Sequence, residues 1–435
     1  EIGSGLVGSE MCIRDRVNIY GEKFMANFEC KIVKIEKKAN HPNADRLTIY
    51  NIGGYNCISN KLPDGSDRYN IGDLVVYIPE NALLPEWLLR KMDFWDEEKG
   101  KGILAGKYGN RVKPLKLRGI FSEGVLYPCL TMREYEEGFS VDEVVKSYGY
   151  DENTKFVFQE KSTEGYVGFT PAVEGIDVED FLGITKYEPV IPATMGGEIF
   201  NGGTEIVVPY DVEPIQKYMD AFVEGEMFEA TEKIHGTQTR FIFTKGNVNE
   251  ETFGENKDIY IASKGQGDKG LFFKNNLSNS NSYYVRAFKL NNIEEKVINS
   301  ELYKSSDMLT LFGETYGMQD LKYGLENGHI GYRLFDVYVG KPRQGRFLNY
   351  EECKSFAEEL GIERVPSLYI GEYSFDKVME LTSGKTTLGK NKDQIREGVV
   401  IRPLNERYVE ELGRVFLKSV SEAYKLRKGE TTEYN

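Results

Sequence analysis

The chain has 435 residues and a formal net charge of −14, with 69 acidic and 55 basic side chains. The length indicates two or three domains, and the acidic balance argues against a protein that coats nucleic acid over its whole surface. No apolar run approaches the roughly 18 residues of a membrane-spanning helix, and the five cysteines form no CxxC pair, which argues against a zinc site or a disulfide framework. We therefore expect no membrane partner and a cytoplasmic protein with reduced thiols, or a nuclear one in a eukaryotic host.

The first residues, EIGSGLVGSEMCIRDR, do not have the charged-then-apolar layout of a signal peptide. They resemble a translation of sequencing-adapter DNA, and we expect residues 1 to about 16 not to be natural protein. Met25 is then the expected start. Residues 1–25 are interpreted as a non-native or disordered leader and excluded from the fold prediction.

Residues 26–135 contain short alternating segments, including FECKIVKIEKKA, RLTIYNIGGYNCISN, DLVVYIP and GVLYPCL. Apolar residues at every second position, broken by Gly, Asn and Asp turns, are typical of strands. Several such strands within about 100 residues predict a small β-barrel or sandwich.

One loop of this region, Gly100–Gly119, contains six cations and no acid. It is either a solvated loop or, on an OB-type barrel, a loop that contacts nucleic-acid phosphates. The absence of acids within an acidic protein favours the second interpretation. The candidate RNA-binding residues are Lys107, Arg111, Lys113, Lys116 and Arg118.

Residues 136–214 are rich in acids, Gly and Pro, and we interpret them as a connector with a short helix near Val178–Leu182. Residues 215–430 return to strand-like alternation. Two helical segments are expected there, NSYYVRAFKLNNIEEKVIN and NYEECKSFAEELG. Strand runs interspersed with helices predict an α+β domain of antiparallel sheets with flanking helices.

A series of polar residues interrupts these predicted strands over about 185 residues, from Lys233 to Lys418. A lysine followed by glycine in a tight turn suits a nucleophile, two glutamates on separate strands suit a metal ion and a ribose, and a later lysine suits a phosphate. Each residue alone has an ordinary structural explanation, and the set together favours one site. Its members are Lys233, His235, Ser263, Lys264, Glu314, Phe335, Asp336, Glu397 and Lys418.

The segments that carry this set are TEKIHGT, FGETYG, YRLFDVYVG, EGVVIRP and VFLKSVS. They resemble the motifs of the covalent nucleotidyltransferases, which include ATP-dependent polynucleotide ligases and mRNA capping enzymes. TEKIHGT is most similar to the RNA ligase 2 branch, which has histidine where DNA ligases and capping enzymes usually have aspartate.

Four N-terminal segments, HPNADRLTIYNIGG, YNIGDLVVYIPENALLPEWLL, RVKPLKLRGIFSEGVLYP and LGITKYEPVIPA, resemble the Naegleria-type RNA ligases. The resemblance covers about residues 26–430 and implies an N-terminal OB-fold β-barrel (26–135), the connector (136–214) and a C-terminal nucleotidyltransferase domain, an ATP-grasp-like ligase domain (215–430). HPNADRL also resembles OB domains of the tRNA-binding type.

The resemblance implies an ATP-dependent RNA ligase with Mg²⁺ or Mn²⁺ as cofactor. The nucleophile would take AMP from ATP, pass it to the 5′-phosphate of an RNA end, and let a 3′-hydroxyl expel it. A free lysine is largely charged at pH 7, so nearby cations must favour its neutral form. We expect a monomer that acts in RNA repair on RNA with 3′-OH and 5′-phosphate ends, in the form of a nicked duplex.

The resemblance also implies a role for each residue of the set. Lys233 would be the nucleophile, with His235 and Lys418 as its catalytic partners. Glu232 would recognise the adenine edge, Phe335 would stack on the base, Glu314 would hold the ribose, Glu397 and Glu314 would bind metal, and Lys264 or Arg240 would contact sugar or RNA phosphates.

Three positions depart from the family pattern. Gln238 replaces a common asparagine, and Lys264 after Ser263 replaces an arginine whose bidentate fork a lysine does not reproduce. Phe416 takes the first slot of a usual lysine pair, so Lys425 or Arg427 would complete the phosphate clamp. A DNA ligase, a capping-type guanylyltransferase and a non-catalytic RNA-binding relative remain as alternatives.

Overall fold

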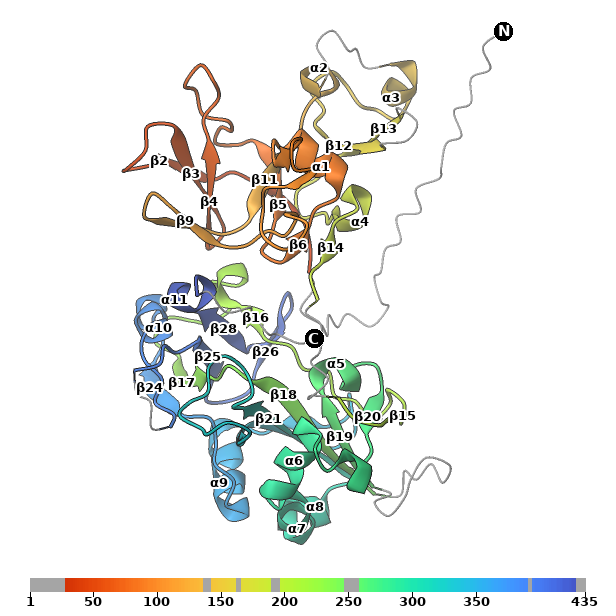
Figure 1. Cartoon of the computed structure of the whole chain (residues 1–435), viewed down its shortest axis with the longest axis vertical. Coiled ribbons are helices and arrows are strands. Elements are labelled where there is room, and N and C mark those ends of the chain that lie inside the picture. The colour runs from red at the N-terminus through yellow and green to blue at the C-terminus, as the bar shows by residue number, and fades with distance from the viewer. Residues whose placement is uncertain are drawn as a thin grey trace, which may run out of the picture.

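The computed structural model describes residues 28–135, 142–161, 166–188, 196–245, 258–389 and 393–427. They form two domains, an N-terminal one that reaches residue 188 and a C-terminal one from residue 196 (Figure 1). The expected leader, residues 1–25, lies outside the described residues.

Two three-stranded antiparallel sheets form the centre of the N-terminal domain. In Leu47–Ile52 every second residue is buried, as the alternation of LTIYNI predicts. Tyr50, Val75 and Leu126 from both sheets share one core cluster, in agreement with the expected small barrel or sandwich. The strands are β1 (Ile32–Lys34), β5 (Leu74–Ile78) and β11 (Val125–Pro128) in one sheet and β2 (Lys37–Asn40), β3 (Leu47–Ile52) and β4 (Tyr55–Asn60) in the other.

Smaller elements surround these sheets. They are β6 (Ala82–Leu83), α1 (Glu86–Lys91), β7 (Trp95–Asp96), β8 (Lys101–Gly102), β9 (Leu115–Leu117), β10 (Ile120–Ser122), α2 (Met132–Tyr135), α3 (Glu143–Ser147), β12 (Phe156–Lys161), β13 (Tyr166–Pro171), α4 (Glu179–Leu182) and β14 (Thr185–Lys186). Helix α4 confirms the short helix predicted there.

The expected connector over 136–214 is corrected by the packing of its described residues. Val157, Leu182 and Ile184 are buried in the N-terminal core beside Ile32 and Val76. Strand β15 (Ile199–Asn201) instead joins a sheet of the C-terminal domain, where the apolar residues near 207 are also buried. Short apolar runs between the acids gain more free energy by burial in a domain core than by exposure in a linker.

The C-terminal domain contains a seven-stranded and a five-stranded sheet. The seven-stranded sheet has the order β15, β20 (Leu271–Phe273), β19 (Ile259–Ser263), β18 (Thr237–Thr244), β21 (Met308–Tyr316), β22 (Gly331–Val339) and β23 (Arg346–Phe347). The five-stranded sheet has the order β16 (Glu213–Pro214), β28 (Leu417–Val420), β25 (Gly398–Pro403), β17 (Met227–Lys233) and β24 (Ser367–Glu372). Strands β26 (Tyr408–Val409) and β27 (Gly413–Arg414) form a separate pair.

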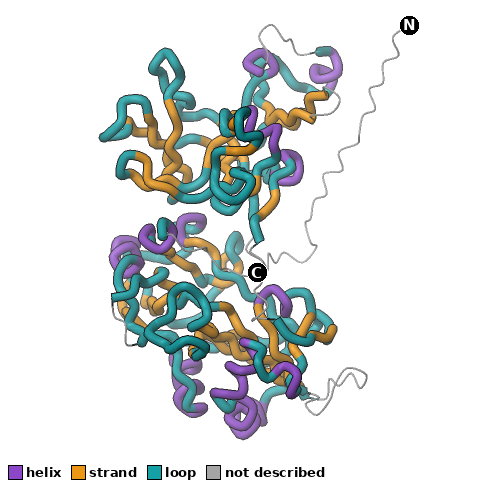
Figure 2. Tube along the Cα trace, viewed as in Figure 1, coloured by secondary structure: helices purple, strands orange, loops and turns teal. Residues whose placement is uncertain are grey.

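Helices lie on the outside of these sheets (Figure 2). Helix α9 (Tyr350–Leu360) begins with a capping box of Asn349 and Glu352 and ends at Gly361, whose left-handed backbone suits glycine. The others are α5 (Lys264–Gly267), α6 (Tyr283–Leu290), α7 (Ile293–Asn299), α8 (Glu301–Ser305), α10 (Phe375–Thr382) and α11 (Glu422–Lys425), with 3-10 turns at Ile215–Lys217 and Leu277–Asn279. Both expected helical segments and the α+β class are thus confirmed, and none of the described helices could span a bilayer.

Candidate active site

The KIHG segment connects the two sheets of the C-terminal domain. Strand β17 of the five-stranded sheet ends at Lys233, and β18 of the seven-stranded sheet begins at Thr237. A Cβ atom on Gly236 would lie 2.3 Å from the carbonyl oxygen of Thr315 and 2.8 Å from Cγ of Glu314. Glycine therefore lets the chain pass close to β21 at the crossover.

Gly236→Ala is expected to lower the free energy of unfolding by about 1–3 kcal/mol, because the added methyl group overpacks a backbone contact that cannot shift cheaply. Urea denaturation measures the change. Gly168→Ala is the matched control, since its added Cβ would be 3.4 Å or more from every neighbour. Equal stability of the two variants would contradict the assigned close approach.

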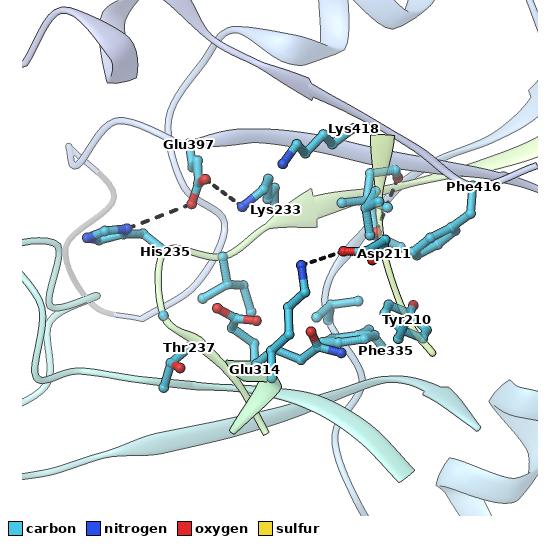
Figure 3. Close-up of a pocket in the computed structure, with 18 of the residues that line it drawn as sticks. Tyr210, Asp211, Lys233, His235, Thr237, Glu314, Phe335, Glu397, Phe416 and Lys418 are labelled. Atoms are coloured by element: carbon cyan, nitrogen blue, oxygen red, sulfur yellow. Dashed lines mark hydrogen bonds and ion pairs between the residues drawn. The ribbon is translucent and has the colours of Figure 1, made fainter. Parts of the chain in front are cut away.

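A cavity of about 500 Å³ lies between the two sheets at this crossover (Figure 3). Its lining includes most of the set predicted from the sequence. Those residues are Lys233, His235, Lys264, Glu314, Phe335, Glu397 and Lys418. The tertiary structure thus brings together side chains that are up to about 185 positions apart.

Lys233 points into the cavity from the end of β17, and its Nζ lies 2.5 Å from Oε1 of Glu397. The two side chains are 18% and 2% exposed, respectively. Glu397 immediately precedes β25, which pairs with both β17 and β28. A Cβ on Gly398 would lie 2.0 Å from the carbonyl oxygen of Ser419, so glycine permits this tight strand pairing. Figure 3 shows Lys418 of β28 on the same side of the cavity.

His235 is almost fully buried, and both of its ring nitrogens have polar neighbours. Nε2 lies 2.6 Å from Oδ1 of Asp320, and Nδ1 lies 2.7 Å from the hydroxyl of Tyr424. Oε2 of Glu397 is 3.8 Å from Nδ1. Burial opposes the ionisation of Asp320, but hydrogen bonds from His235 and Arg427 outweigh it and hold the pKa of this carboxyl well below its usual range.

Aromatic side chains form one wall of the cavity. The ring of Tyr210 lies 5.5 Å from Phe335 and 5.6 Å from Phe416, measured between centroids. Phe416, which replaces the first lysine of the usual pair, is 6% exposed and packs in the core between the sheets. This wall offers a planar apolar face to a flat ring.

Glu314 reaches the cavity from the seven-stranded sheet, where it is paired in register with Gln238. Lys264 is held by Asp211, with 2.5 Å between Nζ and Oδ1. Two further lysines of the lining, Lys186 and Lys269, were not singled out from the sequence. Lys186 belongs to the quoted segment LGITKYEPVIPA, and Lys269 lies just after helix α5, which begins at Lys264.

Glu232, predicted at the adenine edge, also lines the cavity. Its carboxylate accepts hydrogen bonds from the Thr387 backbone N–H at 2.8 Å and from the hydroxyls of Thr386 and Thr387. Neither threonine lines the cavity. The role of Glu232 in adenine recognition stays a prediction.

The predicted RNA contacts Arg240 and Arg111 are both buried in the structure. Arg240 is fully buried in β18, with Nη1 2.6 Å from Oδ1 of Asp268, and its guanidinium has no hydrogen-bond partner among the described residues. Arg111 is 4% exposed, donates hydrogen bonds to Asn81 and stacks over Tyr187. Burial leaves both guanidinium groups little access to a bound RNA.

The remaining cations of Gly100–Gly119 have separate positions. Lys107 and Arg118 are exposed, and Lys113 lines a second cavity of about 990 Å³ between the domains. Lys116 is half exposed and lies 3.1 Å from Glu422. The second cavity shares Lys186, Glu397 and Lys418 with the first, so the two are continuous along this wall.

The two cations expected to complete the phosphate clamp both have acidic partners in the protein. Lys425 forms an ion pair with Glu123 of the N-terminal domain. Arg427 lies 2.9 Å from Asp320, and neither cation lines the cavity around Lys233.

Acidic side chains that could bind a metal ion are spread over the cavity. Within the described ranges, no three His, Cys, Asp or Glu side chains are grouped to hold one. Glu314 and Glu397 line the cavity from different sheets. Mg²⁺ usually keeps several waters and takes one or two carboxylates together with substrate phosphates. Glu397 beside Lys233 fits that donor set.

Comparisons with known proteins agree with this architecture. Residues 226–420 match the family described as RNA ligase, and residues 30–129 match a family described as an OB-fold domain. A search of curated proteins gives no significant match.

Solved structures of a Naegleria gruberi RNA ligase are similar to this chain in fold. A mutant solved with ATP and Mn has a TM-score of 0.62 at 20% identity, over 91% of this chain and 98% of that chain. A second mutant, with AMP and Mn, has a TM-score of 0.63 at 20% identity, over 92% and 98%. The same ligase with PPi has a TM-score of 0.62 at 20% identity, over 92% and 98%.

Proposed function

We propose that this chain, which carries an RNA ligase family domain behind an N-terminal OB fold, is an ATP-dependent RNA ligase. It would join 3′-OH and 5′-phosphate ends through a lysyl–AMP intermediate. The observation that carries the proposal is Lys233, placed in a cavity between two sheets with its Nζ 2.5 Å from Glu397. A lysine held at one point on a rigid crossover suits nucleophilic attack.

In the first step the proton of the Lys233 ammonium leaves, and Glu397 is the neighbouring base at 2.5 Å. The amine nitrogen then bonds to the α-phosphorus of ATP while the bond to the bridging oxygen breaks and pyrophosphate departs. The 5′-phosphate oxygen of an RNA end next displaces the lysine and takes AMP. Finally a 3′-hydroxyl attacks this phosphate, and AMP is released.

The cavity walls support binding of ATP. Phe335 and the neighbouring rings offer the adenine a stacking face, and stacking of this kind contributes roughly 1–3 kcal/mol. The triphosphate carries several negative charges, and the lining supplies cations for it. These cations are Lys186, Lys264, Lys269 and Lys418.

Mg²⁺ or Mn²⁺ would bind at Glu397, with Glu314 on the opposite wall as a second candidate. A divalent ion supplies neutralisation of negative charge on the phosphates. Glu397 would then serve both the ion and Lys233.

The test is covalent labelling of the purified full chain with α-labelled ATP or GTP and Mg²⁺ or Mn²⁺. We expect acid-labile label on denatured protein from ATP alone, followed by joining of a nicked RNA duplex. Label from GTP alone would favour a capping-type enzyme, and joining of DNA but not RNA would favour a DNA ligase. No label, on protein shown by mass not to carry AMP already, would favour an RNA-binding relative.

We propose that two exposed cations of Gly100–Gly119, Lys107 and Arg118, and Lys113, which lines the interdomain cavity, contact RNA phosphates. Changing Lys107, Lys113 and Arg118 to glutamine is expected to weaken RNA binding and to lower the slope of log affinity against log salt by about 1 per lost contact. ATP labelling should remain near wild type. Binding titrations at several salt concentrations measure the slope, and an unchanged slope would contradict these contacts.

A further inference from the structure

Helix α11 (Glu422–Lys425) lies between the two domains (Figure 1). Lys425 forms an ion pair with Glu123 and lies 3.7 Å from Glu80, both in the N-terminal domain. Glu422 lies 3.1 Å from Lys116 of β9. The side chains of Lys425 and Glu123 are 13% and 10% exposed, so this pair is shielded from solvent and its loss matters more than that of a surface pair.

The same short segment also contacts His235. The Tyr424 hydroxyl lies 2.7 Å from Nδ1, and the two rings meet edge to face with 5.4 Å between centroids. Arg427 stacks over Tyr424 and lies 2.9 Å from Asp320, the partner of Nε2. The two shortest polar contacts of the imidazole are therefore made by this segment or tied to it, and the third, from Nδ1 to Oε2 of Glu397 at 3.8 Å, is independent of it.

These contacts hold the imidazole from two sides. Oδ1 of Asp320 lies 2.6 Å from Nε2, and its Oδ2 lies 2.9 Å from Nε of Arg427. Nδ1 and the Tyr424 hydroxyl share a hydrogen bond at 2.7 Å. A shift of α11 would withdraw Tyr424 and leave the ring held at Nε2.

We infer that α11 couples docking of the N-terminal domain to the orientation of His235 beside Lys233, and that Tyr424 is the positioning residue in this coupling. The inference rests on the proposed function, because it concerns the rate at which Lys233 reacts with ATP. Glu123 fixes Lys425, the adjacent Tyr424 fixes the imidazole, and His235 stands two residues from the nucleophile.

The experiment is a double-mutant cycle on the full chain, with Tyr424→Phe, Glu123→Gln and the two combined. The rate constant of lysyl–AMP formation and the ATP concentration for half-maximal rate are measured in single turnovers. The wild type must first be shown to label. A wild type that does not label would contradict the proposed function itself, and not only the coupling.

Each single variant is expected to lower the rate constant roughly three- to tenfold, as for loss of one hydrogen bond of ordinary strength. The ATP concentration for half-maximal rate should not change. Because both residues act through one relay, the double variant should be no slower than the slower single variant, whereas independent effects would multiply.

Tyr69→Phe is the matched control for loss of a buried hydroxyl, since Tyr69 donates to the Leu126 carbonyl at 3.0 Å inside the N-terminal domain. Glu160→Gln is the control for loss of a lysine partner, Lys91, away from the domain interface. Both controls should label at the wild-type rate. Wild-type rates in the single variants, multiplied losses in the double variant, or weaker ATP binding at an unchanged rate constant would each overturn the coupling.

Discussion

Lys233→Met is expected to reduce covalent labelling from ATP to background. Methionine approximates the length and volume of lysine but offers no amine to attack phosphorus, so no lysyl–AMP can form at this position. The side chain is 18% exposed and packs at the end of β17, and the substitution should leave the fold intact. Gel analysis of denatured protein after incubation with α-labelled ATP measures the loss, and circular dichroism checks the fold.

Lys289→Met is the matched control, because Lys289 is an exposed residue of α6 outside the cavity. It should label as the wild type does. The Lys233 variant should still join RNA that already carries a 5′-linked AMP, since that step no longer needs the nucleophile. Full labelling of the Lys233 variant would show that another residue carries AMP.

Glu397→Gln is expected to slow lysyl–AMP formation by roughly 10²–10³-fold, the loss usual for one preorganised charged group in an active site. Glutamine keeps the shape but is neither a base for Lys233 nor an anionic ligand for a divalent ion. The final extent of labelling at long times should equal that of the wild type, because the nucleophile remains. The time course of labelling therefore separates this role from that of Lys233.

Glu134→Gln is its control, since Glu134 pairs with Lys155 on the N-terminal domain with 2.5 Å between the charged atoms. Removing that surface carboxylate should leave the rate unchanged. A Glu397 variant that labels at the wild-type rate would contradict both roles proposed for this carboxylate. Raising the Mn²⁺ concentration should restore part of the rate if metal binding is the weakened property.

Much of the fold could be predicted because strand and helix periods are local properties of the sequence. LTIYNI becomes β3 with alternating burial, and the expected helical segment NYEECKSFAEELG becomes α9. The connector was not predicted correctly, since its acids and glycines conceal short apolar runs. Those runs are buried against distant parts of the chain, and no local pattern reports such a contact.

For the candidate site, the order of motifs predicted which residues line one cavity, and the structure brings seven of them together. The burial of Arg240 could not be predicted, since its partner Asp268 lies beyond the end of the neighbouring strand β19. The position of a charged residue within a strand indicates on which face of the sheet it lies. It does not indicate whether an oppositely charged residue packs over it there.

The sequence by itself determined the strands, the crossover glycine and the residue types of the nucleophile motif, because each depends on neighbours along the chain. Only the tertiary structure decided the partner of each charge. Lys233 meets Glu397 across 164 positions, and Lys425 meets Glu123 across 302. Such pairs depend on how sheets and domains pack. Packing is driven by the burial of apolar surface, and this driving force has no direction. The ion pairs that tie the N-terminal domain to His235 therefore follow from the packed fold and not from any motif.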